Sequence, residues 1–96
     1  MYGTVAKLKL KLGKTEAFKN YMDEENREIP GAVDSYVYQS DEDESILYLV
    51  VMFSNMEAYV QYSESAISRS RYEKMLPLLE YEPEWHDGQV IFHRKY

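Results

Sequence analysis

Polar and apolar residues alternate along residues 4–12, TVAKLKLKL. The even positions from Ala6 to Leu12 are apolar, and lysines occupy the odd positions from Lys7 to Lys11. A period of two residues is typical of a β-strand with one buried face. We therefore predict a strand over 4–12 that ends at Gly13, with its apolar face toward helices and its lysine face on the opposite side.

A helical pattern follows Gly13. Thr15 is the predicted N-cap, and the side of the helix that faces the sheet carries Ala17, Phe18, Tyr21 and Met22. The helix must end before the turn Ile29-Pro30-Gly31, because proline restricts the residue before it to extended backbone. Residues 33–40, VDSYVYQS, are rich in valine and tyrosine and predict a second strand.

The polar run DEDES, residues 41–45, predicts a connection between two paired strands. It lacks the glycine and the ligand spacing of a calcium-binding loop, which favours a solvated turn over a metal site. The next strand, ILYLVVMF at 46–53, is apolar on both faces. Ser54 and Glu57 then match a capping box, S-x-x-E, which predicts the start of a helix carrying Ala58, Tyr59 and Tyr62.

A further helix is predicted after Ser65, and Pro77 should kink it or begin a new short turn. The closing stretch EPEWHDGQVIFHRKY, residues 82–96, predicts the last strand, with Val90 and Phe92 on one face and Ile91 and His93 on the other. The predicted order is β-α-β-β-α-β. That order is typical of an α+β, ferredoxin-like fold, in which an antiparallel sheet carries helices on one face.

The strand over 46–53 has no polar face, although an antiparallel sheet with one wet face should alternate in every strand. Helices can cover only one side of such a sheet. We therefore expect a second copy to cover the other side, which predicts a homodimer packed sheet to sheet.

Size and charge restrict the possibilities further. The 96 residues predict a single domain over 1–96, and the net charge of −6 argues against a nucleic-acid partner, since binding phosphates requires a concentrated positive surface. No apolar run approaches the ~20 residues of a membrane helix, and the start MYGTVAKLKL is no signal peptide. We expect a cytoplasmic protein without a membrane partner. The absence of cysteine rules out disulfides and thiolate metal sites.

Four segments together resemble the antibiotic-biosynthesis-monooxygenase-like family: GTVAKLKLKLGKTEAF, the turn IPG, the strand LYLVVMF and the closing EWHDGQV. The resemblance implies a dimeric α/β barrel with a cavity in each subunit between sheet and helices. It also implies one of two activities that members of that family have: oxygenation of phenols and quinols without a cofactor, or degradation of haem. Haem-degrading relatives are recognised by an asparagine on the first strand, and residues 4–12 contain none, which disfavours that activity.

Cofactor-free oxygenation needs an apolar pocket, a base of suitable pKa and donors for a developing oxyanion. His86 is the candidate catalytic base, because histidine titrates nearest neutral pH. The alternative is that His86 fixes a turn through a hydrogen bond to Asp87 or to a backbone carbonyl. His93 is expected at an interface or on the surface, and two histidines seven residues apart, without further ligands, do not predict a metal site.

The candidate walls of a substrate pocket are aromatic or flexible apolar side chains: Tyr21, Met22, Tyr59, Tyr62 and Trp85. For each of them, the alternative is that the side chain packs in the core or at an interface. If 82–96 begins as a regular strand, Trp85 and His86 point to opposite faces, and only one of them can face a given pocket.

Two functions follow from these observations. The first is a cofactor-independent monooxygenase for a small aromatic, phenolic or quinol ligand. The alternative is a non-catalytic dimeric module that binds a small molecule or serves as a scaffold, since one fold hosts both. A cavity that contains a polar group favours the first, and a core filled solidly by tyrosines favours the second.

Overall fold

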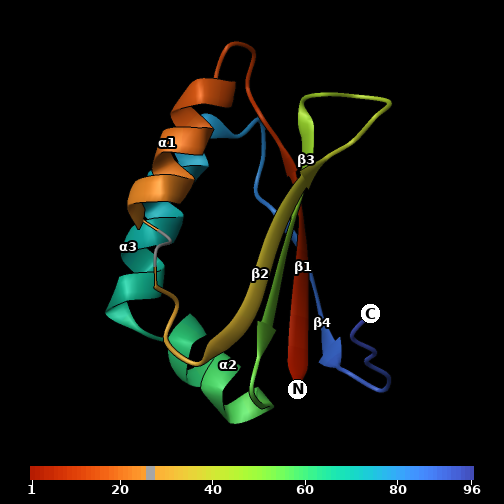
Figure 1. The fold of residues 1–96 in the computed structure, drawn as a ribbon. Coiled ribbons are helices and arrows are strands. Elements are labelled where there is room, and N and C mark those ends of the chain that lie inside the picture. The colour runs from red at the N-terminus through yellow and green to blue at the C-terminus, as the bar shows by residue number, and fades with distance from the viewer. Residues whose placement is uncertain (26–27) are drawn as a thin grey trace.

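The computed structural model describes residues 1–25 and 28–96, which form four strands and a layer of helices (Figure 1). The elements in chain order are β1 (Tyr2–Lys9), α1 (Thr15–Glu25), β2 (Ala32–Gln39), β3 (Ile46–Phe53), α2 (Met56–Ser63), α3 (Ala66–Met75), the 3₁₀-helix η1 (Leu76–Leu78) and β4 (Glu84–Gln89). Of the helices in these described ranges, none has the length and apolar character needed to cross a bilayer.

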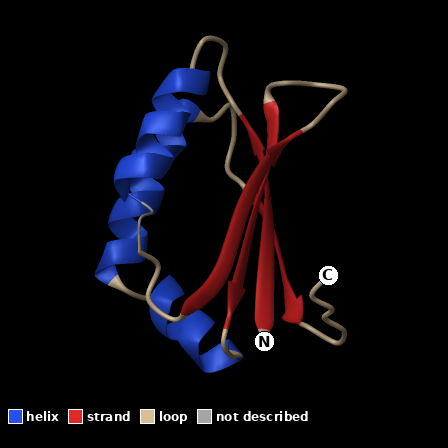
Figure 2. Cartoon of the chain, viewed as in Figure 1, coloured by secondary structure: helices blue, strands red, loops and turns tan. Residues whose placement is uncertain are grey.

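The four strands form one sheet in the order β2-β3-β1-β4, and every neighbouring pair is antiparallel. All the helices lie on the same side of this sheet (Figure 2). The two helices predicted after Ser54 and after Ser65 are present as α2 and α3, and Pro77 lies in the short η1 that follows. The predicted ferredoxin-like α+β fold is therefore confirmed.

The core lies between the sheet and the helices. It consists of alternate residues of the two central strands and a few residues of the helical layer: Ala6, Leu8 and Leu10, then Leu47, Leu49, Val51 and Phe53, together with Phe18, Met75 and Leu79. Each fully buried leucine or phenylalanine side chain stabilises the fold by about 1.5–3 kcal/mol relative to an exposed one. The alternation in β1 thus decides which face the helices cover, and the pairing of β3 with β1 decides which residues of β3 are buried.

The first and the last of the predicted strands both end earlier than expected. β1 ends at Lys9, and Leu12 is 99% exposed instead of lying in the core. The reason is pairing: Lys9 lies opposite Ile46, the first residue of β3, so the residues after Leu10 have no strand beside them. Leu10 makes only an isolated bridge with Leu79.

The last strand is likewise shorter than the pattern over 82–96 predicts. β4 ends at Gln89, which pairs with Tyr2 at the very start of β1. Beyond it, Val90 N donates to the carbonyl oxygen of Met1 (2.9 Å), the residue just before β1. Ile91 and Phe92 are consequently exposed and outside any strand.

Local caps explain where the helices begin. Asn55, not Ser54, is the N-cap of α2, because its Oδ1 accepts a hydrogen bond from Ala58 N (2.8 Å). At the turn before β2, Gly31 has φ +82°, and a Cβ there would lie 2.9 Å from Ala58 Cβ. Only glycine combines that backbone conformation with such a close approach of α2.

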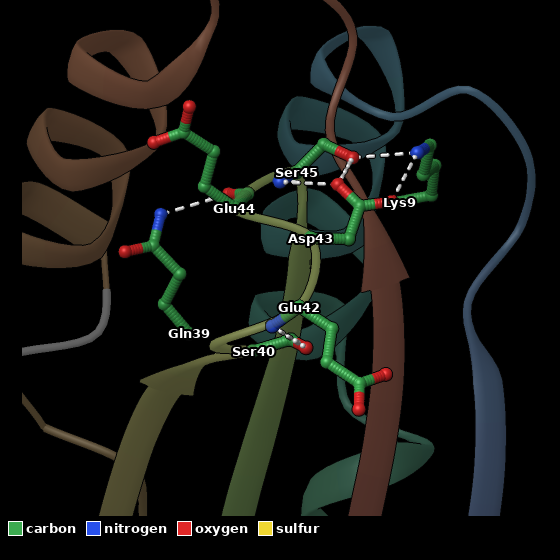
Figure 3. Close-up of polar contacts among 7 residues, drawn as sticks. All are labelled: Lys9, Gln39, Ser40, Glu42, Asp43, Glu44 and Ser45. Atoms are coloured by element: carbon green, nitrogen blue, oxygen red, sulfur yellow. Dashed lines mark hydrogen bonds and ion pairs between the residues drawn. The ribbon is translucent and has the colours of Figure 1, made fainter.

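The connection between β2 and β3 is bound to β1 by a small polar network (Figure 3). Lys9 Nζ donates to Asp43 Oδ2 (3.0 Å) and to Ser45 Oγ (2.5 Å), and Asp43 Oδ1 accepts from Ser45 N and Oγ. The hydrogen bond from the Ser45 side chain, followed by that from Lys9, lowers the pKa of Asp43 to about 2. The DEDES segment is therefore an exposed turn, as its composition predicted, and its pairing with a lysine of β1 is an addition from the structure.

The other face of the sheet carries none of the described helices (Figure 2); its centre is apolar, and Lys7, Glu84 and His86 lie on the side formed by β1 and β4. β3 directs Tyr48, Val50 and Met52 toward it, and Val5 of β1 lies opposite Val50. Tyr38 of β2 stacks on Tyr48 with ring centroids 5.1 Å apart. We call this surface the open sheet face.

We predict that a second copy of the chain covers the open sheet face and that the dimer buries more than ~1,200 Å² in total, the size of a specific interface. Val50→Glu should shift the chain toward a monomer, because a carboxylate would be buried in the centre of this contact. Ile67→Glu, on an exposed position of α3, should not change the assembly. Sedimentation velocity at micromolar concentration measures this, and a monomeric wild type would contradict the prediction.

Candidate functional site

A cavity of about 450 Å³ lies between the sheet and the helices. Its volume is within the range of about 300–1,000 Å³ that is common for small-molecule sites. Most of its wall is apolar or aromatic, formed chiefly by Ile29, Leu49, Val51, Phe53, Met75 and Trp85 together with the tyrosines Tyr21, Tyr59, Tyr62 and Tyr72. The core is thus not filled solidly by its tyrosines.

The sheet side of the cavity contains a carboxylate, that of Asp87 on β4. The strand register places Thr4 of β1 opposite Asp87, and both side chains face the helices. Thr4 Oγ1 donates to Asp87 Oδ1 (2.6 Å), and Tyr59 OH from α2 donates to Oδ2 (2.8 Å). A carboxylate has about four acceptor positions, so each oxygen can still accept a hydrogen bond from a ligand.

Tyr59 connects this carboxylate to the aromatic wall. Its ring lies 5.2 Å from that of Tyr2 and 5.3 Å from that of Phe53, measured between centroids. Burial, followed by the hydrogen bond to Asp87, raises the pKa of Tyr59 to about 12. At neutral pH Tyr59 is therefore a neutral hydrogen-bond donor that holds the Asp87 carboxylate in place.

The helical side of the cavity contains the opposite charge. Arg71 of α3 donates through Nη1 to Glu28 O (2.7 Å) and to Tyr62 OH (3.1 Å). Tyr21 OH in turn donates to Arg71 O (2.9 Å), which joins α1 to α3 behind the cavity. Burial, followed by the charge of Glu82, raises the pKa of the neighbouring Tyr72.

Four of the residues predicted for the pocket line this cavity: Tyr21, Tyr59, Tyr62 and Trp85. The indole of Trp85 is 43% exposed, so it forms a wall of the cavity rather than part of the buried core. Met22 packs at the edge of the hydrophobic core and is not part of the cavity wall. The expectation for Met22 as a pocket residue is corrected accordingly.

His86 lies on the other face of the sheet. β4 is a regular strand at this point, so Trp85 and Asp87 face the helices, while His86 lies beside Val5 on the open sheet face. Its Nε2 is 3.1 Å from Glu84 Oε1, and it has no hydrogen bond to Asp87. The expectation that His86 reaches the cavity is therefore not met, and the two-residue site reduces to Trp85.

Three residues that matter for this cavity were missing from the sequence prediction: Thr4, Asp87 and Arg71. The two-residue period could have revealed Asp87, since it shares a face with Trp85, and Thr4, since it shares one with Ala6. Nothing in the local sequence singles out Arg71, because its position depends on how α3 packs. Within residues 1–25 and 28–96, no three His, Cys, Asp or Glu side chains gather closely enough to hold a metal ion.

Comparison with known proteins agrees with this architecture. The sequence profile of the antibiotic biosynthesis monooxygenase family matches residues 1–73. No curated protein matches the chain.

Solved structures resemble it over nearly their whole length. A Nitrosomonas europaea protein, provisionally named an antibiotic biosynthesis monooxygenase, is 19% identical with a TM-score of 0.82 and covers 96% of this chain and 100% of its own. A conserved protein from Methanosarcina mazei is 24% identical with a TM-score of 0.79 and coverages of 92% and 90%. Rv0793 from Mycobacterium tuberculosis is 13% identical with a TM-score of 0.81 and covers 98% of each chain. The TM-scores establish a shared fold, and at such low sequence identities the likeness shows the fold alone.

We predict that Asp87→Asn lowers the pKa of Tyr59 from about 12 toward the ordinary value for tyrosine, because it removes the negative charge that disfavours the tyrosinate. In the wild type, the folded state keeps the Tyr59 proton to a higher pH than the unfolded state does. The protonated Tyr59 therefore contributes its full stabilisation of the fold below the unfolded pKa near 10. This stabilisation is lost as the pH rises through 12.

The measurement is the ultraviolet titration of tyrosinate, taken as the difference between each protein and its Tyr59→Phe counterpart. The burial contribution should remain, so the Asp87→Asn value should still exceed that of a free tyrosine. An unchanged pKa of Tyr59 would show that Asp87 does not act on it.

Proposed function

Because the chain belongs to the antibiotic biosynthesis monooxygenase family, we propose that its cavity binds a small phenol or quinol and oxygenates it without a cofactor. The observation that carries the proposal is a cavity of about 450 Å³ with apolar walls and one carboxylate held by two donors. Dioxygen is apolar and small, so such a cavity admits it. The aromatic ring of the ligand would lie against Trp85 and the tyrosines, where offset or edge-to-face contacts are favourable.

Electrons for the reaction come from the substrate. A phenol with an unsubstituted ring position reacts with one dioxygen to give a quinone and one water. One oxygen atom enters the ring, the other leaves as water with the two hydrogens removed from the substrate, and the substrate supplies all four electrons. No reductant besides the phenol is needed.

Asp87 is the proposed proton acceptor. A carboxylate is a weak base toward a phenol that has not yet reacted. A phenol that has passed one electron to dioxygen is a much stronger acid, and Asp87 can then take its proton. In this proposal Thr4 and Tyr59 are positioning residues, since they hold the carboxylate and do not touch the reacting atoms.

The non-catalytic alternative is favoured by one observation, the position of His86. His86, the candidate base predicted from the sequence, lies outside the cavity, on the open sheet face. A protein that only binds a small molecule would need the cavity and its hydrogen-bonding groups but no base. Both functions therefore require that the cavity bind a small molecule, but only the monooxygenase converts it to a product.

Oxygen consumption with a panel of substituted phenols and hydroquinones, together with identification of the quinone product, tests the proposal. We expect Asp87→Asn to lower kcat by about 10²-fold or more, which is typical for loss of a positioned proton acceptor. Trp85→Ala should act mainly on KM, because it removes a binding wall.

His86→Ala separates the two candidate bases. It alters the neighbouring residue on the same strand, and we expect kcat to change much less than in Asp87→Asn. A large loss in His86→Ala together with little effect of Asp87→Asn would contradict the role given to Asp87. Binding without oxygen consumption across the panel would favour the non-catalytic alternative.

A further inference from the structure

Two arginines of α3 border the cavity on the side away from Asp87. Successive helical residues are about 100° apart, so Ser68, Tyr72 and Met75 form the row that faces the cavity. Arg71 and Arg69 flank that row on its two sides, and all five residues line the cavity. A ligand in the cavity would therefore meet cationic groups on α3 as well as the carboxylate on β4.

Neither arginine has a carboxylate partner within the described residues. Three lysines of this acidic chain do form such pairs: Lys9 with Asp43, Lys19 with Glu16 and Lys74 with Glu25. Arg71 and Asp87 line the same cavity but are not paired with one another. The guanidinium charge at the cavity is thus available to a group that the described residues do not supply.

Hydrogen bonds hold the Arg71 guanidinium in one orientation and, among the described residues, engage one of its three nitrogens. Both of its side-chain hydrogen bonds leave from Nη1, to Glu28 O and Tyr62 OH, and they restrict the half-buried guanidinium to one position. A guanidinium carries five N–H donors, and those on Nε and Nη2 make no hydrogen bond within the residues that the structure describes. A fixed guanidinium with free, parallel donors is the arrangement that binds a carboxylate in two places.

We infer that the cavity selects an aromatic ligand that carries both a carboxylate and a ring hydroxyl, with the carboxylate on Arg71 and the hydroxyl toward Asp87. The reaction of the hydroxyl rests on the proposed function. The inference deepens that function by naming hydroxylated aromatic acids as the ligand class. Opposite charges at the two sides of the cavity give the ligand one orientation, since its anionic group is attracted by Arg71 and repelled by Asp87. Arg69, at the other border of the row, adds to the positive field.

The net charge of −6 opposes an anionic ligand only at long range. Salt screens exposed charges over about 8–10 Å, so most surface carboxylates act weakly inside the cavity. The direct, partly desolvated contact with Arg71 is the larger effect, because hydrogen bonds between two ionised groups are about twice as strong as neutral ones.

The test compares two probes of nearly equal shape, 2,5-dihydroxybenzoate and the neutral 2,5-dihydroxybenzamide, by titration calorimetry. We expect the wild type to bind the acid about tenfold to a hundredfold more tightly than the amide, and added salt to reduce that ratio. The indole N–H resonance of Trp85, the chain's only tryptophan, should shift on binding and so locate the probe in this cavity. Arg71→Gln should remove the preference for the acid and leave the affinity for the amide nearly unchanged.

The control is Arg94→Gln, which removes an arginine in the closing segment that lies over Phe92 and does not line the cavity. It should keep the full preference for the acid. Arg71→Lys should retain part of the preference, since it keeps the charge and loses the two-point geometry. If Arg71→Gln does not fold, the ratio in the wild type and its dependence on salt still decide.

Three results would overturn the inference: equal affinity for acid and amide, an unchanged preference in Arg71→Gln, or no binding of either probe at millimolar concentration. Oxygen consumption with the same two probes keeps this inference separate from the proposed function. A preference for the acid that disappears in Arg71→Gln, without oxygen consumption, supports the inference and contradicts the monooxygenase.

Discussion

The pairing of β1 with its two neighbours is the constraint on which the rest of the molecule depends. Side chains of paired strands share a face, so the register with β3 places Ala6 beside Leu49 in the core. The register with β4 places Thr4 beside Asp87. A shift of one residue would move Asp87 to the open sheet face and bring His86 to the cavity, because side chains alternate with a period of two.

The same alternation gives the two faces of the sheet different roles. One face packs against the helices and contains the cavity. There, hydrogen bonds from Thr4 on β1 and Tyr59 on α2 hold the carboxylate of Asp87. The other face has an apolar centre with charged residues and His86 beside it, none of the described helices covers it, and its tyrosines Tyr36 and Tyr38 are more than half exposed. Tyrosine suits both environments, since its ring packs like an apolar side chain and its hydroxyl remains available for a hydrogen bond.

Within the cavity, charge and aromatic surface are separated in space. Asp87 lies on the sheet side, Arg71 on the helical side, and the aromatic walls between them belong to both layers. Tyr59, whose pKa is raised to about 12, stays neutral and donates to the carboxylate. Such an arrangement would give the proposed ligand one orientation, as the oxygenation of a single ring position requires.

The sequence by itself determined the element order, the ferredoxin-like class and the buried face of β1, because these follow from periodicities of two and about 3.6 residues. The strand β3 is apolar on both faces, so only its pairing with β1 decided which of its residues enter the core. The sequence also identified Trp85, Tyr21, Tyr59 and Tyr62, whose size and amphipathic character suit a cavity wall. Strand ends depended on which partner residues were available, so Leu12 and Ile91 lost the strand positions that their pattern predicted. The site itself was decided by tertiary structure: the regular β4 directed His86 away, and the packing of α3 brought Arg71 across from Asp87, a relation between distant residues that no local pattern encodes.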